Sequence, residues 1–420
     1  MGHLAGKDIY RRLGTKIDSL TMRAPWNDAL HEILRELYTE AEADLIVRMP
    51  SSPATFEQIQ RRTRTEEAPL RALLERLCDK GLVMDICLRG NYYYLISPMI
   101  IGIFEFTMMR TRGQTNHAKC ARLFHEYMEN NDSFFRANFG SGQRVSVMRA
   151  LPHEGTIDDT DHVEILDYER AGAIVDAASS RAIGICSCRH ERVHLGQKQC
   201  DIPLETCLSF DSAADYLTRH GMARAADAAE IRDLMAQSRE QGLVFCADNS
   251  RTGVSFICQC CGCCCTALRG ISQSGYPGII VTSNYIARCN AAECLACGTC
   301  EESCPINAVS LNGGDHPVID ESICLGCGVC ALDCETGAMR LAERDRRVLH
   351  PEDTFERVIL QCLERGTLQD QIFSDPEKLS HSFMRAVVGG FLKLPPVKRA
   401  LMSDSLRSSF LNALKSRAGA

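Results

Sequence analysis

Two stretches in the C-terminal half of the chain carry the same cysteine spacing, C-x2-C-x2-C-x3-C, at an offset of 30 residues. The first is "CLACGTCEESCPINAVSL" and the second is "CLGCGVCALDCETGAMRL". The cysteines are Cys294, Cys297, Cys300, Cys304, Cys324, Cys327, Cys330 and Cys334. Thiols this dense indicate metal ligands, and residues 289–345 read as Cys/Gly-rich loops with short strands. Paired zinc knuckles are the weaker interpretation, because structural zinc sites usually take their four ligands as two pairs.

Cysteine use in the whole chain also favours metal or redox chemistry, with 24 cysteines in 420 residues. Disulfide frameworks are typical of small secreted domains, and this chain is not small. Its first residues, "MGHLAGKDIYRRLG", lack the apolar core of a signal peptide. No apolar run approaches the roughly 18 residues that a membrane span requires. We therefore expect a cytoplasmic protein that could associate with a membrane through a partner.

The repeat resembles the 4Fe-4S dicluster ferredoxin family, the bacterial two-cluster type. The resemblance implies two [4Fe-4S] clusters, with the fourth cysteine of each motif crossing to the other cluster. One cluster would then take Cys294, Cys297, Cys300 and Cys334, and the other Cys324, Cys327, Cys330 and Cys304. Gly298, Gly326 and Gly328 should let the backbone bend around the sulfurs, so that amide N–H groups stabilise the anionic cluster. Pro305 follows Cys304 but Glu335 follows Cys334, a departure that removes no ligand.

A further group of cysteines lies in "CSCRHERVHLGQKQCDIPLETC", with the spacing C-x-C-x11-C-x6-C. Its members are Cys186, Cys188, Cys200 and Cys207. Four thiolates suffice for one cubane or one zinc ion, and the neighbouring iron-sulfur motifs favour a third cluster, with zinc as the alternative. Arg189 should offset the negative charge of the thiolates and tune the potential of a bound cluster. His190 and His194 could replace a ligand, but exposure or hydrogen bonding is the favoured interpretation.

Between these groups, "FICQCCGCCCTAL" holds six cysteines in eight residues. They are Cys258, Cys260, Cys261, Cys263, Cys264 and Cys265. Six thiols exceed the four iron corners of one cubane, and adjacent side chains on an extended chain diverge. We interpret the stretch as a loop that supplies ligands to at least one extra cluster, jointly with Cys186–Cys207. Cys246 and Cys289 are long-range contributors to consider. The spacing leaves open which of the six are ligands.

The remaining sequence predicts an α+β protein. "NDALHEILRELY" places Leu30, Ile33, Leu34 and Leu37 on one helical face, and Thr39 with Glu42 forms a capping box. Two strands flank Arg89-Gly90-Asn91, so the segment 27–97 resembles a winged helix. Downstream, "VEILDY" reads as a strand and "ERAGAIVDAASS" as a helix.

We divide the chain into a leader (1–26), a winged-helix-like docking domain (27–97), a helical connector (98–162), a Cys-rich α/β iron-sulfur domain (163–288), a dicluster ferredoxin domain (289–345) and a basic helical tail (346–420).

The wider layout resembles a set of ferredoxin-type proteins of anaerobes that begin with a winged-helix-like segment. The resemblance covers about residues 27–345 and rests on "CSCRH", "PLETCLSFDSAADY", "FICQCCGCCC" and "SNYIARCNAAECLACGTC". It implies electron transfer in anaerobic metabolism and names no substrate. The pattern of this set uses Cys258, Cys260, Cys261, Cys264 and Cys265, which makes Cys263 the dispensable member. The tail after 345 lies outside the resemblance.

These observations predict two [4Fe-4S] clusters, one or two more, and no catalytic residue. We find no P-loop, complete dinucleotide fingerprint or nucleophile elbow, so an electron-transfer subunit is favoured over a complete enzyme. Its partner would be a larger oxidoreductase or flavoprotein.

An iron-sulfur, redox-sensing transcription regulator is the alternative. The helix Glu66–Lys80 has a net charge of −1, which suits a protein partner better than DNA. The tail His381–Ala420, with seven Lys/Arg and one acid, could contact a partner, its own protein or a membrane surface.

Overall fold

The computed structural model describes residues 8–113, 115–140, 145–157, 169–311, 313–345, 348, 350–373, 379–392, 394–402, 408, 410 and 411. The chain is α+β, as predicted, and its contacts divide it into two compact units. Unit 1 comprises Met1–Thr107, Arg122–Val145 and Thr354–Ala420, and unit 2 comprises Met108–Ala121 and Ser146–Asp353. Helices α6 (Phe104–Met109) and α7 (His117–Met128) each begin in one unit and end in the other.

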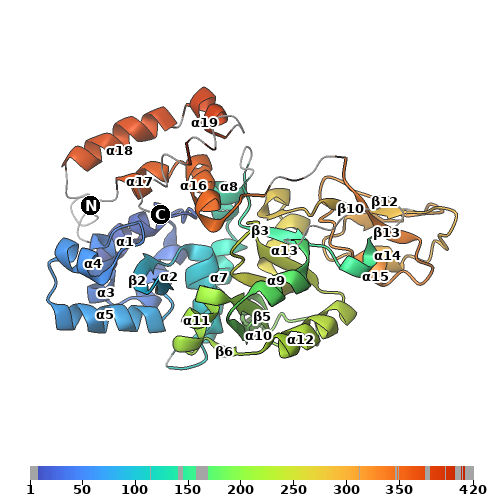
Figure 1. Cartoon of the computed structure of the whole chain (residues 1–420), viewed down its shortest axis with the longest axis horizontal. Coiled ribbons are helices and arrows are strands. Elements are labelled where there is room, and N and C mark those ends of the chain that lie inside the picture. The colour runs from blue at the N-terminus through green and yellow to red at the C-terminus, as the bar shows by residue number, and fades with distance from the viewer. Residues whose placement is uncertain are drawn as a thin grey trace. The chain divides into compact units, whose positions relative to one another are not determined.

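Unit 1 opens with five helices and a hairpin (Figure 1). These are α1 (Ile9–Asp18), α2 (Asp28–Leu37), α3 (Glu40–Arg48), α4 (Phe56–Thr63), α5 (Glu67–Asp79), β1 (Val83–Leu88) and β2 (Asn91–Ile96). The predicted capping box is confirmed, because Thr39 and Glu42 bond each other's backbone N–H groups at the start of α3. Arg89 and Gly90 both have positive φ, as a two-residue hairpin turn requires. The predicted helices and hairpin are present; their identification as a winged helix stays a prediction.

Helix α1 lies where the sequence led us to expect a leader. Leu13 and Ile17 are completely buried, so this segment belongs to the core of unit 1. The helix also carries basic residues, Arg11, Arg12 and Lys16, and these masked its short apolar stripe in the sequence.

The C-terminal segment adds four helices to unit 1, as predicted for the tail. They are α16 (Thr354–Arg365), α17 (Leu368–Ile372), α18 (Leu379–Leu392) and α19 (Pro395–Leu401), beside α8 (Ser133–Phe139) from the middle of the chain. Cys362, Leu363 and Leu368 are buried in a shared apolar cluster with Leu392 and Leu411. The tail residues therefore pack against one another. The described helices include none with the length and apolarity needed to cross a membrane.

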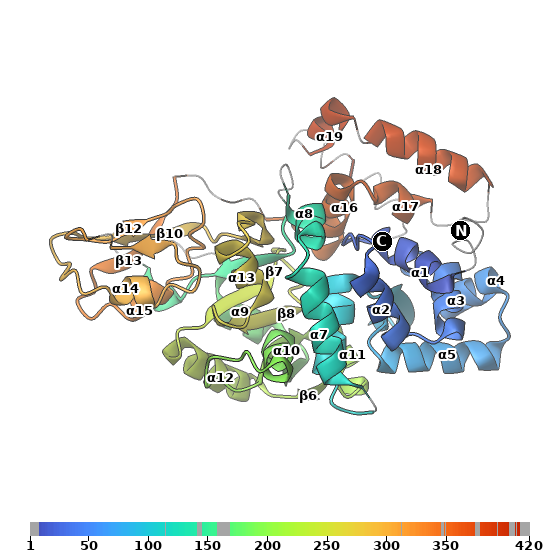
Figure 2. The ribbon, with the colours of Figure 1, turned by 180° about the vertical axis from the view of Figure 1, so that it is seen from behind.

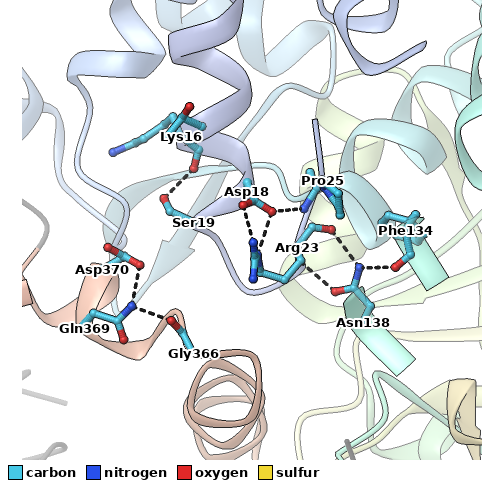
Figure 3. A network of polar contacts seen from close by, with 12 residues as sticks. Lys16, Asp18, Ser19, Arg23, Pro25, Phe134, Asn138, Gly366, Gln369 and Asp370 are labelled. Carbon is cyan, nitrogen blue, oxygen red and sulfur yellow. Dashed lines mark hydrogen bonds and ion pairs between the residues drawn. The ribbon is translucent and has the colours of Figure 1, made fainter. Parts of the chain in front are cut away.

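Polar contacts join three sequence-distant parts of unit 1, and Figure 3 shows those of Asp18, Arg23 and Asn138. Arg23 forms a bidentate ion pair with Asp18 at 2.8 and 2.7 Å. The Asn138 side chain of α8 exchanges two hydrogen bonds with the Arg23 backbone, each 2.9 Å long. Arg365 of α16 donates to the Thr21 carbonyl at 3.1 Å. Such satisfied pairs fix the segment between α1 and α2 against α8 and α16.

Unit 2 is built on a seven-stranded sheet in the order β6-β4-β5-β8-β7-β3-β9, antiparallel except for the β3–β9 pair. The strands are β3 (Met148–Leu151), β4 (Arg181–Ile185), β5 (Glu205–Phe210), β6 (Ala223–Ala225), β7 (Val244–Asp248), β8 (Phe256–Cys260) and β9 (Ile280–Val281). The helices of this region are α9 (Ala171–Ala177), α10 (Ser187–Leu195), α11 (Asp211–Arg219), α12 (Ala228–Glu240) and α13 (Thr266–Ser272). The helix expected from "ERAGAIVDAASS" is therefore confirmed, whereas the "VEILDY" strand lies outside the described residues.

One face of this sheet is apolar, and it forms the core of unit 2. Ile183, Leu208 and Ile257 occupy neighbouring positions on β4, β5 and β8, and they pack with residues of α9 and α12. Because side chains alternate along a strand, the residues next to them point to the opposite face. Those residues include Cys207 and Cys258, so the register assigns apolar side chains to one face and thiols to the other.

The cysteine repeat forms a lobe of its own at one end of unit 2 (Figures 1 and 2). Strand β10 (Tyr285–Cys289) pairs with β13 (Met339–Glu343), and β11 (Val309–Ser310) with β12 (Val318–Ile319). Two one-turn helices, α14 (Thr299–Glu302) and α15 (Val329–Leu332), each contain the third cysteine of a C-x2-C-x2-C triplet. The long pair β10–β13 joins the two ends of the lobe, which accordingly closes on itself. The domain boundaries drawn from the sequence stay predictions.

Candidate metal centres

Four cysteines of the lobe line one cavity. They are Cys304, Cys324, Cys327 and Cys330, three from the second motif and one from the first. Apolar residues such as Ile306, Leu325 and Leu341 form the rest of its wall. This is the crossed set that the resemblance implied, and the chamber is lined by thiols and shielded by apolar groups, as a cubane needs.

The other crossed set gathers near Cys289 on β10. Burial and the neighbouring Cys294 raise the pKa of the Cys289 thiol to about 11, with Cys300 and Cys334 acting in the same direction. Cys300 is buried, whereas Cys297 is exposed. Burial raises the pKa of the Cys300 thiol, with Cys297 and Cys294 acting in the same direction, so the structure brings all four cysteines of this set to one place. Cys289 adds a fifth thiol that the motif spacing does not include.

Backbone amides of the lobe point at the sulfurs. Ala308 donates to Cys304 Sγ at 3.2 Å, and Met339 donates to Cys334 Sγ at 3.3 Å. Gly326 has a φ of +64°, and a Cβ there would overlap the Tyr285 carbonyl. Gly328 and Gly298, with φ of +85° and +84°, stand just before α15 and α14. The predicted glycines therefore adopt the left-handed conformation that brings N–H groups to thiolates.

A second set of cysteines, which we call the thiol face, lies on the sheet. Cys258 of β8 is paired with Cys207 of β5 on one side and Cys246 of β7 on the other. Cys260 lies two residues further along β8, so it points to the same face. A hydrogen bond with Cys246, together with burial, raises the pKa of Cys260 to about 11. The antiparallel register alone assembles these four thiols.

Two helix starts extend the thiol face. Cys186 immediately precedes α10, and Cys265 immediately precedes α13. A hydrogen bond with Cys186 lowers the pKa of the Cys188 thiol, whereas a hydrogen bond with Cys265 and burial raise it. The net shift of this pKa is upward. The chain of contacts therefore runs from Cys186 through Cys188 and Cys265 to Cys260. A bound metal would displace the protons that these buried thiols otherwise retain.

A third set, the four-thiol cluster, comprises Cys200, Cys261, Cys263 and Cys264, whose sulfurs all lie within 4.8 Å of one another. Individual Sγ–Sγ distances are 3.9 Å from Cys200 to both Cys261 and Cys264, 3.7 Å from Cys261 to Cys263, and 3.4 Å from Cys263 to Cys264. Leu243 and Ile202 pack around these sulfurs. The loop after β8 supplies three members, and the loop between α10 and β5 supplies Cys200.

Arg189 of α10 is fully buried beside this cluster. Its Nε donates to Cys261 Sγ at 3.4 Å, and its Nη2 donates to the Gln259 carbonyl at 2.5 Å. A hydrogen bond from Cys264 and the Arg189 guanidinium lower the pKa of Cys261 to about 4, although burial opposes the shift. The structure therefore gives the predicted charge partner a defined position against one thiolate.

These contacts change two interpretations of the sequence. Cys186, Cys188, Cys200 and Cys207 were expected to form one set, but Cys200 contacts Cys261 and Cys264, while the others lie on the thiol face. The reason is that β4 pairs with β5, which fixes Cys207 opposite Gly184, while the intervening loop takes Cys200 to the four-thiol cluster. Cys263, expected to be dispensable, is a member of that cluster.

The four-thiol cluster and the lobe meet at Gly262. A Cβ on Gly262 would lie 2.6 Å from the carbonyl oxygen of Pro305, the residue after Cys304. Nearby, the His153 backbone N–H donates to the Cys327 carbonyl at 3.0 Å, and its Nε2–H donates to the Leu243 carbonyl at 2.9 Å. Burial lowers the pKa of His153 to about 4, so the ring is neutral. Sequence reasoning missed this bridging residue.

His190 and His194 make hydrogen bonds, as predicted. The Nδ1 of His190 lies 2.6 Å from the Met108 carbonyl, and the Nε2 atoms of His190 and His194 lie 3.0 Å apart. The ring of His117 stacks on His194 at a centroid distance of 5.5 Å. These contacts account for both histidines without a place among the thiols.

Comparison with known proteins concerns the lobe. Residues 293–338 match the family model described as a 4Fe-4S dicluster domain. The lobe is of the ferredoxin type. We therefore call it the dicluster module; the match covers this segment and not the rest of the chain. The search of curated proteins and the search of solved structures each gave no match.

The residues present fit iron-sulfur clusters. The module offers two sets of four thiols, one around an apolar cavity, with backbone N–H groups directed at the sulfurs. Together with the cysteine groups of the sheet region, it supports an iron-sulfur electron-transfer role. The ligand set of each cluster and the number of clusters stay predictions.

Proposed function

We propose that the chain is a multi-cluster electron-transfer protein that relays single electrons to or from a larger flavin- or metal-dependent oxidoreductase in anaerobic metabolism. Bound [4Fe-4S] clusters supply one-electron chemistry over a wide range of potentials. Two clusters belong to the dicluster module, with the crossed ligands given above. A third belongs to the thiol face, which offers Cys186, Cys188, Cys207, Cys258, Cys260 and Cys265.

This proposal rests on one observation: the groups of cysteines in unit 2 lie on chain segments that contact or directly follow one another. The module contacts the loop of Cys261–Cys264 through Gly262 and Pro305, and that loop connects β8 of the thiol face to α13. Electron transfer between centres needs proximity, and one packed unit supplies it. A chain with a single isolated site would not need this continuity.

The cysteines of the module and those of the thiol face differ in their exposure to solvent. Cys297 is exposed and its neighbour Leu295 is 73% exposed, whereas Cys260 and Cys265 are buried. We propose that the partner oxidoreductase approaches the module at Leu295 and Cys297, because exchange between proteins requires a centre near the surface.

Helix α18 offers a second surface for a partner. Val387 is 50% exposed and Phe391 is 57% exposed, and Met384 extends the stripe at helical spacing. We propose that this stripe binds a partner subunit, and we prefer a partner to a membrane because the apolar stripe is short.

Anaerobic purification with iron and sulfide analysis tests the function. We expect about 12 irons per chain, four for each of three cubanes, and about 8 if only the module is loaded. Dithionite reduction should give electron paramagnetic resonance signals of reduced [4Fe-4S] clusters, and titration with an oxidised viologen should recover one electron per cluster.

Two results would contradict the proposal. A fully loaded protein whose clusters accept no electron from dithionite would exclude a relay. Salt-dependent binding to duplex DNA that changes on cluster oxidation would favour a redox-sensing regulator.

A further inference from the structure

The sulfurs of the four-thiol cluster lie closer together than those of the two cysteine sets of the dicluster module. Its sulfurs lie 3.4–3.9 Å apart in the four pairs given above, and all lie within 4.8 Å of one another. All 24 cysteines belong to the described residues, and among them no other three thiols come this close together. The thiols of the module are therefore more widely spaced than those of the four-thiol cluster.

The distances agree with a single tetrahedral ion. With metal–sulfur bonds of about 2.3 Å, the sulfurs of a tetrahedral site lie about 3.8 Å apart. In a four-iron cluster each thiolate binds its own iron corner, so the four sulfurs spread more widely around a larger core. The four-thiol cluster has the dimensions of the first arrangement.

The surroundings of the cluster also suit a small ion with four thiolate ligands. Such a site carries a formal charge of −2 with a divalent ion, and the buried guanidinium of Arg189 lies 3.4 Å from Cys261 Sγ. Lys198 donates to the carbonyl of Cys200 itself. Leu243 and Ile202 cover the sulfurs and reduce access of water. Cys264 is fully buried.

All four thiols of the cluster lie in loops, so their positions do not depend on the pairing register of the strands. Cys261, Cys263 and Cys264 belong to one tight turn, and Gly262 within it packs against Pro305. Cys200 closes the set from the loop between α10 and β5. Two chain segments that share one ion are the usual construction of a structural tetrathiolate site.

We propose that Cys200, Cys261, Cys263 and Cys264 bind one ion with four thiolate ligands, zinc or a single iron, as a centre separate from the [4Fe-4S] clusters. The site joins the loop after β8 to the loop after α10 beside the dicluster module. This assignment does not depend on electron transfer to a partner.

X-ray absorption of the full-length, anaerobically purified protein tests the proposal, with zinc and iron measured on the same sample. We expect about one zinc per chain, and a zinc edge fitted by four sulfurs at about 2.3 Å with no second metal in the next shell. If the ion is iron, Mössbauer spectra should instead show a mononuclear tetrathiolate component beside the cubanes. Absence of both, or a four-iron cluster at these residues, overturns the assignment.

Variants locate the ion. Cys263→Ser should lose the zinc, or one iron, and keep the cubane signals; Cys87→Ser, at an exposed position on β1, is the control that should lose neither. A loss of about four irons in Cys263→Ser would show that the residue holds a cubane instead. If Cys263→Ser does not fold, the absorption spectrum of the unaltered chain still decides. Cys327→Ser separates this proposal from the proposed function, because it should remove module iron and leave the ion.

Discussion

The dicluster module and the sheet region of unit 2 both concentrate cysteines, but they place them by different means. In the module, triplets of local spacing set the ligands, and short loops with glycines at positive φ turn the thiols inward. On the sheet, Cys207, Cys246 and Cys258 come from three strands, and only the antiparallel register aligns them. The module therefore encodes its sites in a sequence motif, whereas the sheet region encodes them in the tertiary fold.

This difference has a consequence for robustness. A site built by local spacing depends mainly on its own loop, so substitutions elsewhere should disturb it little. A site built by register depends on every strand that supplies a thiol, because a slip of one residue moves that thiol to the opposite face of the sheet. The predictions below compare the two constructions.

The largest effect is expected from Cys327→Ser, which removes one of the four thiols that line the module cavity. We expect a loss of about four irons per chain, since a cubane with a missing ligand is not retained. The thiol face should keep its iron. Iron analysis with electron paramagnetic resonance measures the change, and Cys87→Ser is the control; loss of all iron would show that the two regions are not loaded separately.

Replacing buried arginines should separate the regions by stability. Arg189→Lys removes a planar fork that reaches Cys261 and the Gln259 carbonyl, and we expect a cost of about 3 kcal/mol. In the module, the half-buried Arg344 donates to the Cys324 and Tyr285 carbonyls at 2.6 and 2.9 Å. Arg344→Lys should cost about 1 kcal/mol, because water can reach that site. Anaerobic denaturant unfolding measures both, and equal costs would remove the distinction.

Gly262→Ala tests the contact between the regions. The added Cβ would meet the backbone of Pro305, which cannot move without moving Cys304, so we expect a loss of about 2 kcal/mol. Gly172→Ala on α9 is the matched control, because a Cβ there has nothing within 4 Å. It should be neutral or slightly stabilising. If the two variants unfold at the same temperature, the loop and the module do not constrain each other.

A smaller effect of pH is expected at His350, which follows the module and bonds Asn249 after β7 at 2.8 Å. Burial lowers its pKa to about 3, with Arg149 and Arg251 acting in the same direction. The unfolded chain therefore binds this proton first, and stability is full above about pH 6.5 and declines as the pH falls. Between pH 7 and 5.5 the loss should be about 1 kcal/mol more than in His350→Asn. Parallel pH dependence in the two proteins would contradict this reading.

The sequence was most informative where chemistry is local. The four cysteines of one expected set line a cavity, and the glycines at 298, 326 and 328 adopt the conformation expected of them. The capping box at Thr39 and the hairpin at Arg89-Gly90 were predicted for the same reason, because each depends on a few neighbouring residues.

Tertiary information was needed elsewhere. Cys200 and Cys207 are close in sequence, yet the pairing of β4 with β5 separates them into different groups. Alternation along β8 could have shown that Cys258 and Cys260 share a face, but the partner strand of Cys246 could not be deduced from the sequence. His153 had no motif at all, since its role depends on carbonyls of Cys327 and Leu243 that only the fold brings together.

The packing of Gly262 on Pro305 also bears on how the protein matures. The turn that carries Cys304 supports the turn that carries Cys261–Cys264, so neither loop reaches its final form against an unformed neighbour. The contact involves the backbone of the two turns and not the metals that they carry. A chain that lacks module iron should therefore still hold the turn of Cys261–Cys264 in place, so that the two centres can be loaded in either order.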